Sequence, residues 1–235
     1  MQLILIRHGQ ARFGTDDYDR LSDLGREQMQ RLADHMRQLP ERPGKLLHGS
    51  LQRQRESANL LRAAYSGNDT PPAVHCDARL DEYDIAGVFW GYLDDVLAAR
   101  PALAPYRDSL NDNPQVFEAV YRDVMRTWLA DPHPDSRGLQ SWAAFQARVR
   151  DAVAALEAGQ RPNGPVILVT SGAVVASLVG QALALDGQAI LGLNRELYNS
   201  SISRLRLGGD GMTLNMFNAV PHLESADAER LLSRR

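Results

Sequence analysis

Cysteine and lysine are almost absent from this sequence of 235 residues. Cys76 is the only cysteine, so no disulfide can form within the chain, and a thiolate metal site is not expected. Lys45 is the only lysine, and every other basic side chain that is always charged is an arginine. Arginine suits bidentate contacts with phosphate, although so lopsided a ratio is also typical of a biased genome composition.

Long hydrophobic runs and an excess of charge are missing too. The apolar stretch over residues 173–185 is too short to span a bilayer, and no cationic region precedes the apolar N-terminal run as it would in a signal peptide. The 26 basic and 29 acidic residues give a net charge of −3, which does not favour nucleic acid or an anionic membrane as a partner. We therefore expect a cytoplasmic protein without nucleic-acid or membrane partners.

Motifs for nucleotides and metals are also lacking. The sequence contains no glycine-rich loop of the Walker or dinucleotide-binding type. Its acidic clusters have no histidine or cysteine at ligand spacing, so solvated loops explain them better than a metal site. These clusters are Asp16, Asp17 and Asp19, and Asp94 with Asp95. We expect no metal and no cofactor.

Short apolar runs alternate with amphipathic stretches, a pattern typical of an α/β fold. Residues 2–6 and 166–169 are nearly continuous apolar runs that suit parallel strands covered on both faces. Residues 201–207 and 212–217 flank a glycine-rich turn and predict a β-hairpin. Further strands are expected over 45–49 and 73–79, and helices over 22–39, 51–65, 114–130, 141–158 and 171–185.

Residues 86–140 have less regular patterning, although they contain the helix expected over 114–130. We interpret them as a cap insertion that packs over the strand ends and shapes a pocket. No repeat or linker divides the rest of the chain, and residues 224–235 form a short polar helix or a frayed end. The prediction is one domain over residues 1–235, a three-layer α/β/α sandwich around a mainly parallel sheet, with an inserted helical cap and a late β-hairpin.

Arg7, His8 and Gly9 follow the first predicted strand directly. The C-terminal end of a strand in an open α/β sheet is where ligands bind. An imidazole with an ordinary pKa offers a neutral ring nitrogen as nucleophile, and phosphoryl transfer requires positive charge around the equatorial oxygens. Arg53 lies in the first turn of the helix after the second strand, where backbone N–H groups also favour an anion. Arg55 lies on a different helix face and is expected to be solvated.

The order and spacing of these motifs resemble the histidine phosphatase superfamily, also called phosphoglycerate mutase-like. The matching motifs are Arg7-His8-Gly9, Arg53-x-Arg55-x-Ser57-Ala58, Leu80-x-Glu82 and Leu21-Ser22-Asp23-Leu24-Gly25. The resemblance implies that His8 is the phosphorylated nucleophile and that Arg7 and Arg53 bind the phosphoryl group. It also implies that Glu82 is the general acid, a role for a carboxyl kept protonated by burial near the substrate.

One position departs from the family's pattern. The second histidine-glycine pair that the family carries after its late buried strand is Ser171-Gly172 here. A hydroxyl and a helix start can still bind phosphate, but neither supplies an imidazolium charge. Loss of one preorganised donor typically lowers the rate by about 10²–10³. We expect weakened catalysis or a compensating group, for which His48 and His75 near the predicted strand ends are candidates.

The resemblance therefore implies a metal-independent phosphomonoesterase that acts on a phosphorylated small molecule through a phosphohistidine on His8. Ser171 keeps an alternative open, a catalytically impaired relative that binds a phosphorylated metabolite, phosphate or a protein partner. A phosphoglycerate mutase is less favoured, because residues 11–21 lack the Asn- and Trp-containing stretch that those mutases carry.

Overall fold

The computed structural model describes residues 1–12, 17–65, 72–159, 162–209 and 211–234. The chain forms two compact units. The first comprises residues 1–82 and 148–235, and the second comprises Tyr83–Ala147. None of the helices in the described ranges is long and apolar enough to cross a membrane.

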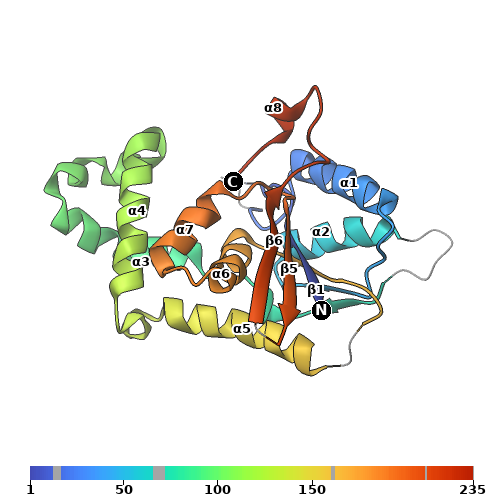
Figure 1. The fold of residues 1–235 in the computed structure, drawn as a ribbon. Coiled ribbons are helices and arrows are strands. Elements are labelled where there is room, and N and C mark those ends of the chain that lie inside the picture. The colour runs from blue at the N-terminus through green and yellow to red at the C-terminus, as the bar shows by residue number, and fades with distance from the viewer. Residues whose placement is uncertain (13–16, 66–71, 160–161, 210, 235) are drawn as a thin grey trace. The chain divides into compact units, whose positions relative to one another are not determined.

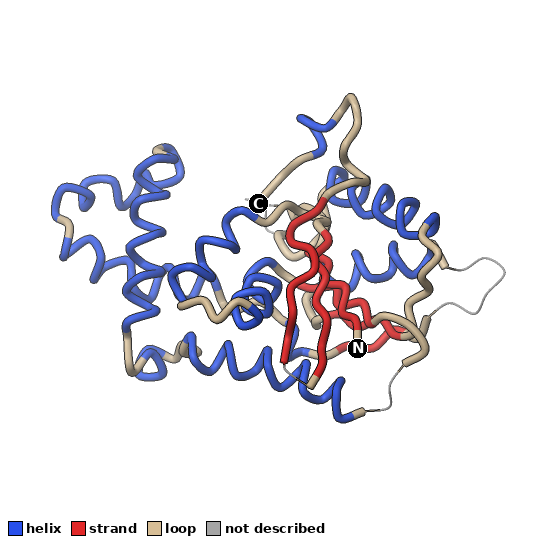
Figure 2. The backbone as a smooth tube through the Cα atoms, viewed as in Figure 1, coloured by secondary structure: helices blue, strands red, loops and turns tan. Residues whose placement is uncertain are grey.

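A sheet forms the centre of the first unit, and Figures 1 and 2 show its strands between helices. Within the described residues it has six strands in the order β3-β2-β4-β1-β5-β6. β1, β2, β3 and β4 run parallel, whereas β5 and β6 form an antiparallel hairpin at one edge. The strands are β1 (Gln2–Arg7), β2 (Lys45–His48), β3 (Val74–Cys76), β4 (Val166–Thr170), β5 (Ile202–Gly208) and β6 (Gly211–Ala219). The mainly parallel sheet and the late hairpin are confirmed.

β1 lies between β4 and β5, and its apolar residues are buried on both faces of the sheet. In its register with β4, Ile6 pairs with Val169 and Arg7 pairs with Thr170. Since the two strands are parallel, they end at the same edge of the sheet. The residues that follow them, His8 and Ser171, therefore start side by side.

Two helices cover one face of this sheet, α1 (Asp23–Gln38) and α2 (Gln52–Ala63). The Ser22 side chain begins α1 as predicted, because its Oγ accepts a hydrogen bond from Gly25 N at 3.0 Å. Side chains from β1, β2, β4, α1 and α2 form one buried apolar cluster. Figure 1 shows α6 (Gly172–Ala182) on the opposite side of the sheet from α1 and α2. The three-layer arrangement is confirmed.

The loop after β1 approaches α1 so closely that two glycines are required. A Cβ atom on Gly9 would lie 2.3 Å from Gly25 O, and one on Gly25 would lie 2.1 Å from Gln10 O. Gly9 N also donates to Ser57 Oγ at 3.2 Å. These contacts fix the backbone that follows His8 against the start of α1 and the middle of α2.

The second unit is helical, including residues 85–112, for which the sequence pattern predicts no regular element. It contains α3 (Ile85–Ala99), α4 (Pro114–Ala130), two 3-10 helices (Pro101–Asp112 and Pro134–Arg137) and the start of α5 (Trp142–Ala158). α3 gives no helical period because apolar residues and glycines fill most of its first nine positions. α4 has the bounds that the sequence predicts. That this unit acts as a cap over the strand ends stays a prediction.

Other boundaries differ from those expected. The strand predicted over 73–79 is shorter in the structure, where β3 ends at Cys76. The Asp77 side chain accepts from Arg79 N at 3.0 Å and starts the 3-10 helix Ala78–Leu80. The helix predicted over 171–185 ends at Ala182, and α7 (Gly187–Glu196), which Asp186 caps, was not predicted. The last helix is α8 (Ala228–Leu231). The loop expected at 66–72 lies almost wholly outside the described residues.

Candidate functional site

Hydrogen bonds to both the N–H and the carbonyl group fix the backbone of His8. Its N–H donates to Thr170 O at 2.8 Å, and its carbonyl accepts from Ser200 N at 3.2 Å and Asn199 Nδ2 at 3.3 Å. Ser200 has a φ of 58°, which is unfavourable for a residue other than glycine. The strained turn is retained where it fixes the position of the buried His8.

The contacts of the His8 ring determine which nitrogen carries the proton. Nδ1 lies 2.7 Å from Gly9 O, and a carbonyl can only accept, so Nδ1 is the protonated nitrogen. Arg53 Nε donates to Nε2 over 3.1 Å, so Nε2 presents its lone pair. Burial, reinforced by the charges of Arg53 and Arg7, lowers the pKa of His8 well below 6.5. At neutral pH the ring is therefore neutral, with Nε2 as its nucleophilic atom.

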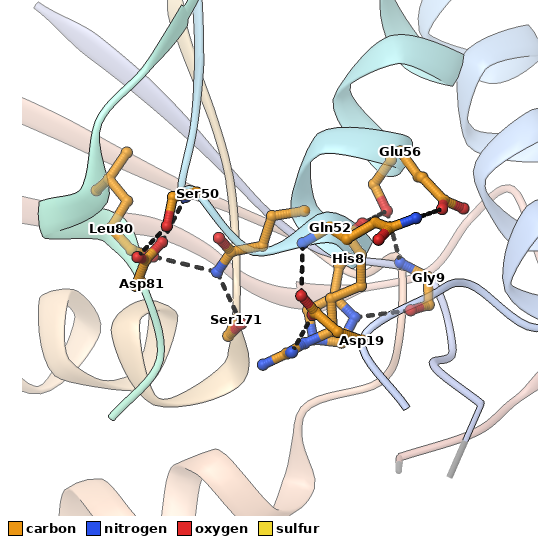
Figure 3. Close-up of polar contacts among 12 residues, drawn as sticks. His8, Gly9, Asp19, Ser50, Gln52, Glu56, Leu80, Asp81 and Ser171 are labelled. Carbon is orange, nitrogen blue, oxygen red and sulfur yellow. Dashed lines mark hydrogen bonds and ion pairs between the residues drawn. The ribbon is translucent and has the colours of Figure 1, made fainter. Parts of the chain in front are cut away.

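Arg53 lies in the first turn of α2 and is 6% exposed. Its Nη1 donates to Asp19 Oδ1 at 2.6 Å, while Gln52 N donates to Asp19 Oδ2 at 2.8 Å. Figure 3 shows Asp19 close to both His8 and Gln52. One carboxylate thus holds the guanidinium and the N-terminus of α2. The prediction that Asp19 belongs only to a solvated loop is wrong, because both of its carboxylate oxygens accept hydrogen bonds from the start of α2.

Arg7 is held by backbone carbonyls of distant segments. Nη1 donates to Leu197 O, and Nη1 and Nη2 each lie 3.2 Å from Arg234 O. Burial lowers the pKa of Arg7 to about 10, although the charge of Glu82 opposes this shift. Its Nε is buried and has no hydrogen-bond partner among the described residues. An unpaired buried donor is unfavourable, so an acceptor bound from outside the chain would stabilise this atom.

Ser171 and Gly172 begin α6 beside Arg7. A Cβ atom on Gly172 would lie 2.3 Å from Asn194 Oδ1 and 3.4 Å from Arg7 Nε, so a larger residue would displace the Asn194 amide. Ser171 is 1% exposed, and its side chain does not cap the helix. Its Oγ instead contacts Gln54 Nε2 at 2.8 Å. The start of α6 therefore faces the guanidinium of Arg7 with the Ser171 hydroxyl at its edge.

Glu82 reaches the same helix start, because its Oε2 accepts from Ala173 N at 3.2 Å. A helix N-terminus favours a negative charge at this position. The segment before Glu82 is fixed by Arg148, whose Nη1 donates to three carbonyl oxygens. These are Ala78 O at 3.1 Å, Arg79 O at 2.9 Å and Asp81 O at 3.0 Å. Glu82 is therefore a structured part of the site and not a residue of a solvated loop.

The structure thus brings the predicted residues together in two linked groups. His8 and Arg53 are in direct contact, and Arg7, Ser171, Gly172 and Glu82 gather at the start of α6. Sequence reasoning missed three participants, namely Asp19, Gln54 and the Arg234 carbonyl. Each comes from a segment far away in sequence from its partner, so no local spacing identifies it.

The candidates for a compensating cation do not join the site in the described part of the chain. His48 Nδ1 hydrogen-bonds to Gly49 O at 2.6 Å, and His75 is exposed on β3. Arg55 is exposed, in line with the sequence-based expectation. Across the described ranges, no group of three or more His, Cys, Asp or Glu residues could hold a metal ion.

The sequence was compared with protein-family profiles and with curated proteins. The sequence profile of the histidine phosphatase superfamily (branch 1) matches residues 3–116 and 111–220. A search of curated protein sequences finds no match.

Several solved structures share the fold. A mycobacterial glucosyl-3-phosphoglycerate phosphatase in complex with VO3 is 24% identical, with a TM-score of 0.59 over 93% of this chain and 98% of that chain. Phosphoglycerate mutase from Bacillus anthracis is 15% identical, with a TM-score of 0.62 over 94% of each chain. Alpha-ribazole phosphatase from Shigella flexneri is 17% identical, with a TM-score of 0.60 over 93% and 96%.

The low pKa of His8 predicts a pH dependence of stability. Below pH 6.5 the unfolded chain binds a proton at this histidine that the folded chain does not bind, so stability falls as the pH falls. At about pH 5.5 the loss from this residue is about 1.4 kcal/mol relative to neutral pH. Urea unfolding at both pH values measures the free energy of unfolding. Its decrease from neutral pH to about pH 5.5 should be smaller by this amount in His8→Asn than in the wild type.

His75→Asn, which removes an exposed histidine, is the control and should show the same fall as the wild type. An equal fall in His8→Asn and the wild type would contradict the neutral, buried state of His8.

Proposed function

Because the chain belongs to the histidine phosphatase superfamily (branch 1), we propose that it is a metal-independent phosphomonoesterase that acts through a phosphohistidine on His8. The observation that carries this proposal is the unprotonated Nε2 of His8, held 3.1 Å from the Arg53 guanidinium. The proposed substrate is a phosphorylated small molecule, whose phosphoryl group provides acceptors for the arginine donors. We propose that the helical second unit determines the specificity for one such substrate over another.

The first step transfers the phosphoryl group to His8. The lone pair of Nε2 attacks phosphorus, the N–P bond forms, and the ester O–P bond breaks. The negative charge of the bound phosphoryl group favours the protonated carboxyl of Glu82, so the leaving oxygen takes its proton from Glu82, which acts as general acid. In the second step, water attacks phosphorus and gives a proton to Glu82, while the N–P electron pair returns to Nε2. Orthophosphate then leaves the site.

The arginines supply the positive charge that these steps require. Arg53 Nε donates to the His8 lone pair in the structure, so a phosphoryl oxygen must take over this donor before Nε2 can attack. Arg7 Nε, which is buried and lacks a hydrogen-bond partner in the described part of the chain, is the second donor. Ser171 and the N–H group of Gly172 complete the proposed phosphate site, because the next N–H group, that of Ala173, already donates to Glu82.

A second function is supported by Ser171. This residue adds a hydroxyl but no positive charge to the site, so it stabilises the transition state less than a cationic donor would. A chain that retains both arginines but turns over slowly would bind phosphorylated metabolites or a protein partner.

Hydrolysis of 4-nitrophenyl phosphate with EDTA present tests these alternatives. We expect activity in the wild type and a loss of more than about 10³-fold in His8→Ala, because the nucleophile is removed. If the wild type binds phosphate but has no activity, and the Ser171→His variant is active, the binding function is favoured. Activity that survives His8→Ala would exclude His8 as the nucleophile.

Glu82→Gln tests the general acid. A poor leaving group such as an alkoxide needs the proton, so its hydrolysis should slow by about 10²–10⁴ in this variant. 4-Nitrophenolate leaves without protonation, so its phosphate ester should be affected much less. Asp84→Asn is the control, since Asp84 is an exposed acid in the same loop and Asn can retain its cap on α3. Equal losses on both esters in Glu82→Gln would argue against the acid role.

A further inference from the structure

Gln54 is a completely buried amide in the first turns of α2, next to the proposed phosphate site. Its Nε2 lies 2.8 Å from Ser171 Oγ and 3.2 Å from Leu80 O. Its Oε1 has no hydrogen-bond partner within the described residues. The buried amide is therefore held through its NH₂ group alone, by two partners at the edge of the site.

The orientation of this amide follows from the chemistry of Leu80 O. A carbonyl can only accept hydrogen bonds, and Thr170 Oγ1 donates to the same oxygen at 2.5 Å. A reversed amide would place Oε1, another acceptor, 3.2 Å from Leu80 O, which is repulsive. The NH₂ group must face Leu80, and its second hydrogen then points to Ser171.

The direction of the Ser171 hydroxyl follows in turn. Because Ser171 Oγ accepts from Gln54, its own hydrogen does not point at the amide and remains to be donated elsewhere. The hydroxyl does not cap α6. The adjacent Gly172 lies against Arg7 Nε, the buried donor that lacks a partner in the described ranges. The Ser171 hydroxyl and Arg7 Nε are thus two donors close to the start of α6.

We propose that Gln54 is a positioning residue, which turns the Ser171 hydroxyl hydrogen toward a bound phosphoryl oxygen by donating to Ser171 Oγ. The inference rests on the proposed phosphate site. It explains how a serine can serve at this position, since a hydroxyl that must donate gives more directed binding than one that rotates freely. The ligand is the oxyanion of a phosphomonoester or of phosphate itself.

A double-mutant cycle with orthovanadate and inorganic phosphate as probes tests this role. Calorimetry should show that Gln54→Leu weakens binding by about 10-fold, as expected for one hydrogen bond to a charged group. Ser171→Ala should weaken binding by a similar factor. In the Ser171→Ala background, Gln54→Leu should change the dissociation constant less than about twofold, because the hydroxyl that it orients is gone.

Gln54→Met, which is uncharged and similar in length, gives a second variant if the leucine variant does not fold, as judged by its thermal melt. A thioether cannot donate to Ser171 Oγ, so binding should also weaken, and this loss should shrink in the Ser171→Ala background. An undiminished effect of either Gln54 variant in that background, or no effect in the wild-type background, would overturn the role of Gln54. A wild type that binds neither probe would overturn the phosphate site as well.

Discussion

The site depends on the contact between Arg53 Nε and His8 Nε2, which joins the ends of two segments that follow separate strands. This contact exists in its observed form only because Gly9 O holds the proton on Nδ1. Gly9 in turn is fixed against Gly25 at a distance that excludes any side chain. The packing of the loop against α1 thus determines which nitrogen of His8 is available for chemistry.

Charge in the site is balanced around this neutral ring. Burial lowers the pKa of His8, and the two guanidiniums that lie near its ring lower it further. The carboxylate of Asp19 compensates the charge of Arg53, and Glu82, which accepts from Ala173 N, compensates that of Arg7. Such a balance retains the buried cations when no ligand is bound, since an isolated buried charge would be unfavourable. It also leaves donors that a phosphoryl group could engage.

Local patterns in the sequence predict much of this architecture. The continuous burial of β1 and β4 and the cap at Ser22 each follow from a few neighbouring residues. The register of two parallel strands then brings His8 and Ser171 together. The contacts of Asp19 and Gln54 could not be predicted, since they join residues 34 and 117 positions apart through packing that no single segment encodes. α3 was missed because its apolar residues lack a helical period.

The central claim is that His8 reacts through Nε2, and the position of the phosphoryl group on the ring tests it most directly. The intermediate can be trapped by quenching turnover in alkali, where phosphohistidine survives, and NMR of the digested peptide distinguishes the two ring nitrogens. We predict phosphorylation of His8 at Nε2, because Gly9 O occupies the Nδ1 side. Phosphorylation at Nδ1, or on any other residue, would contradict the account.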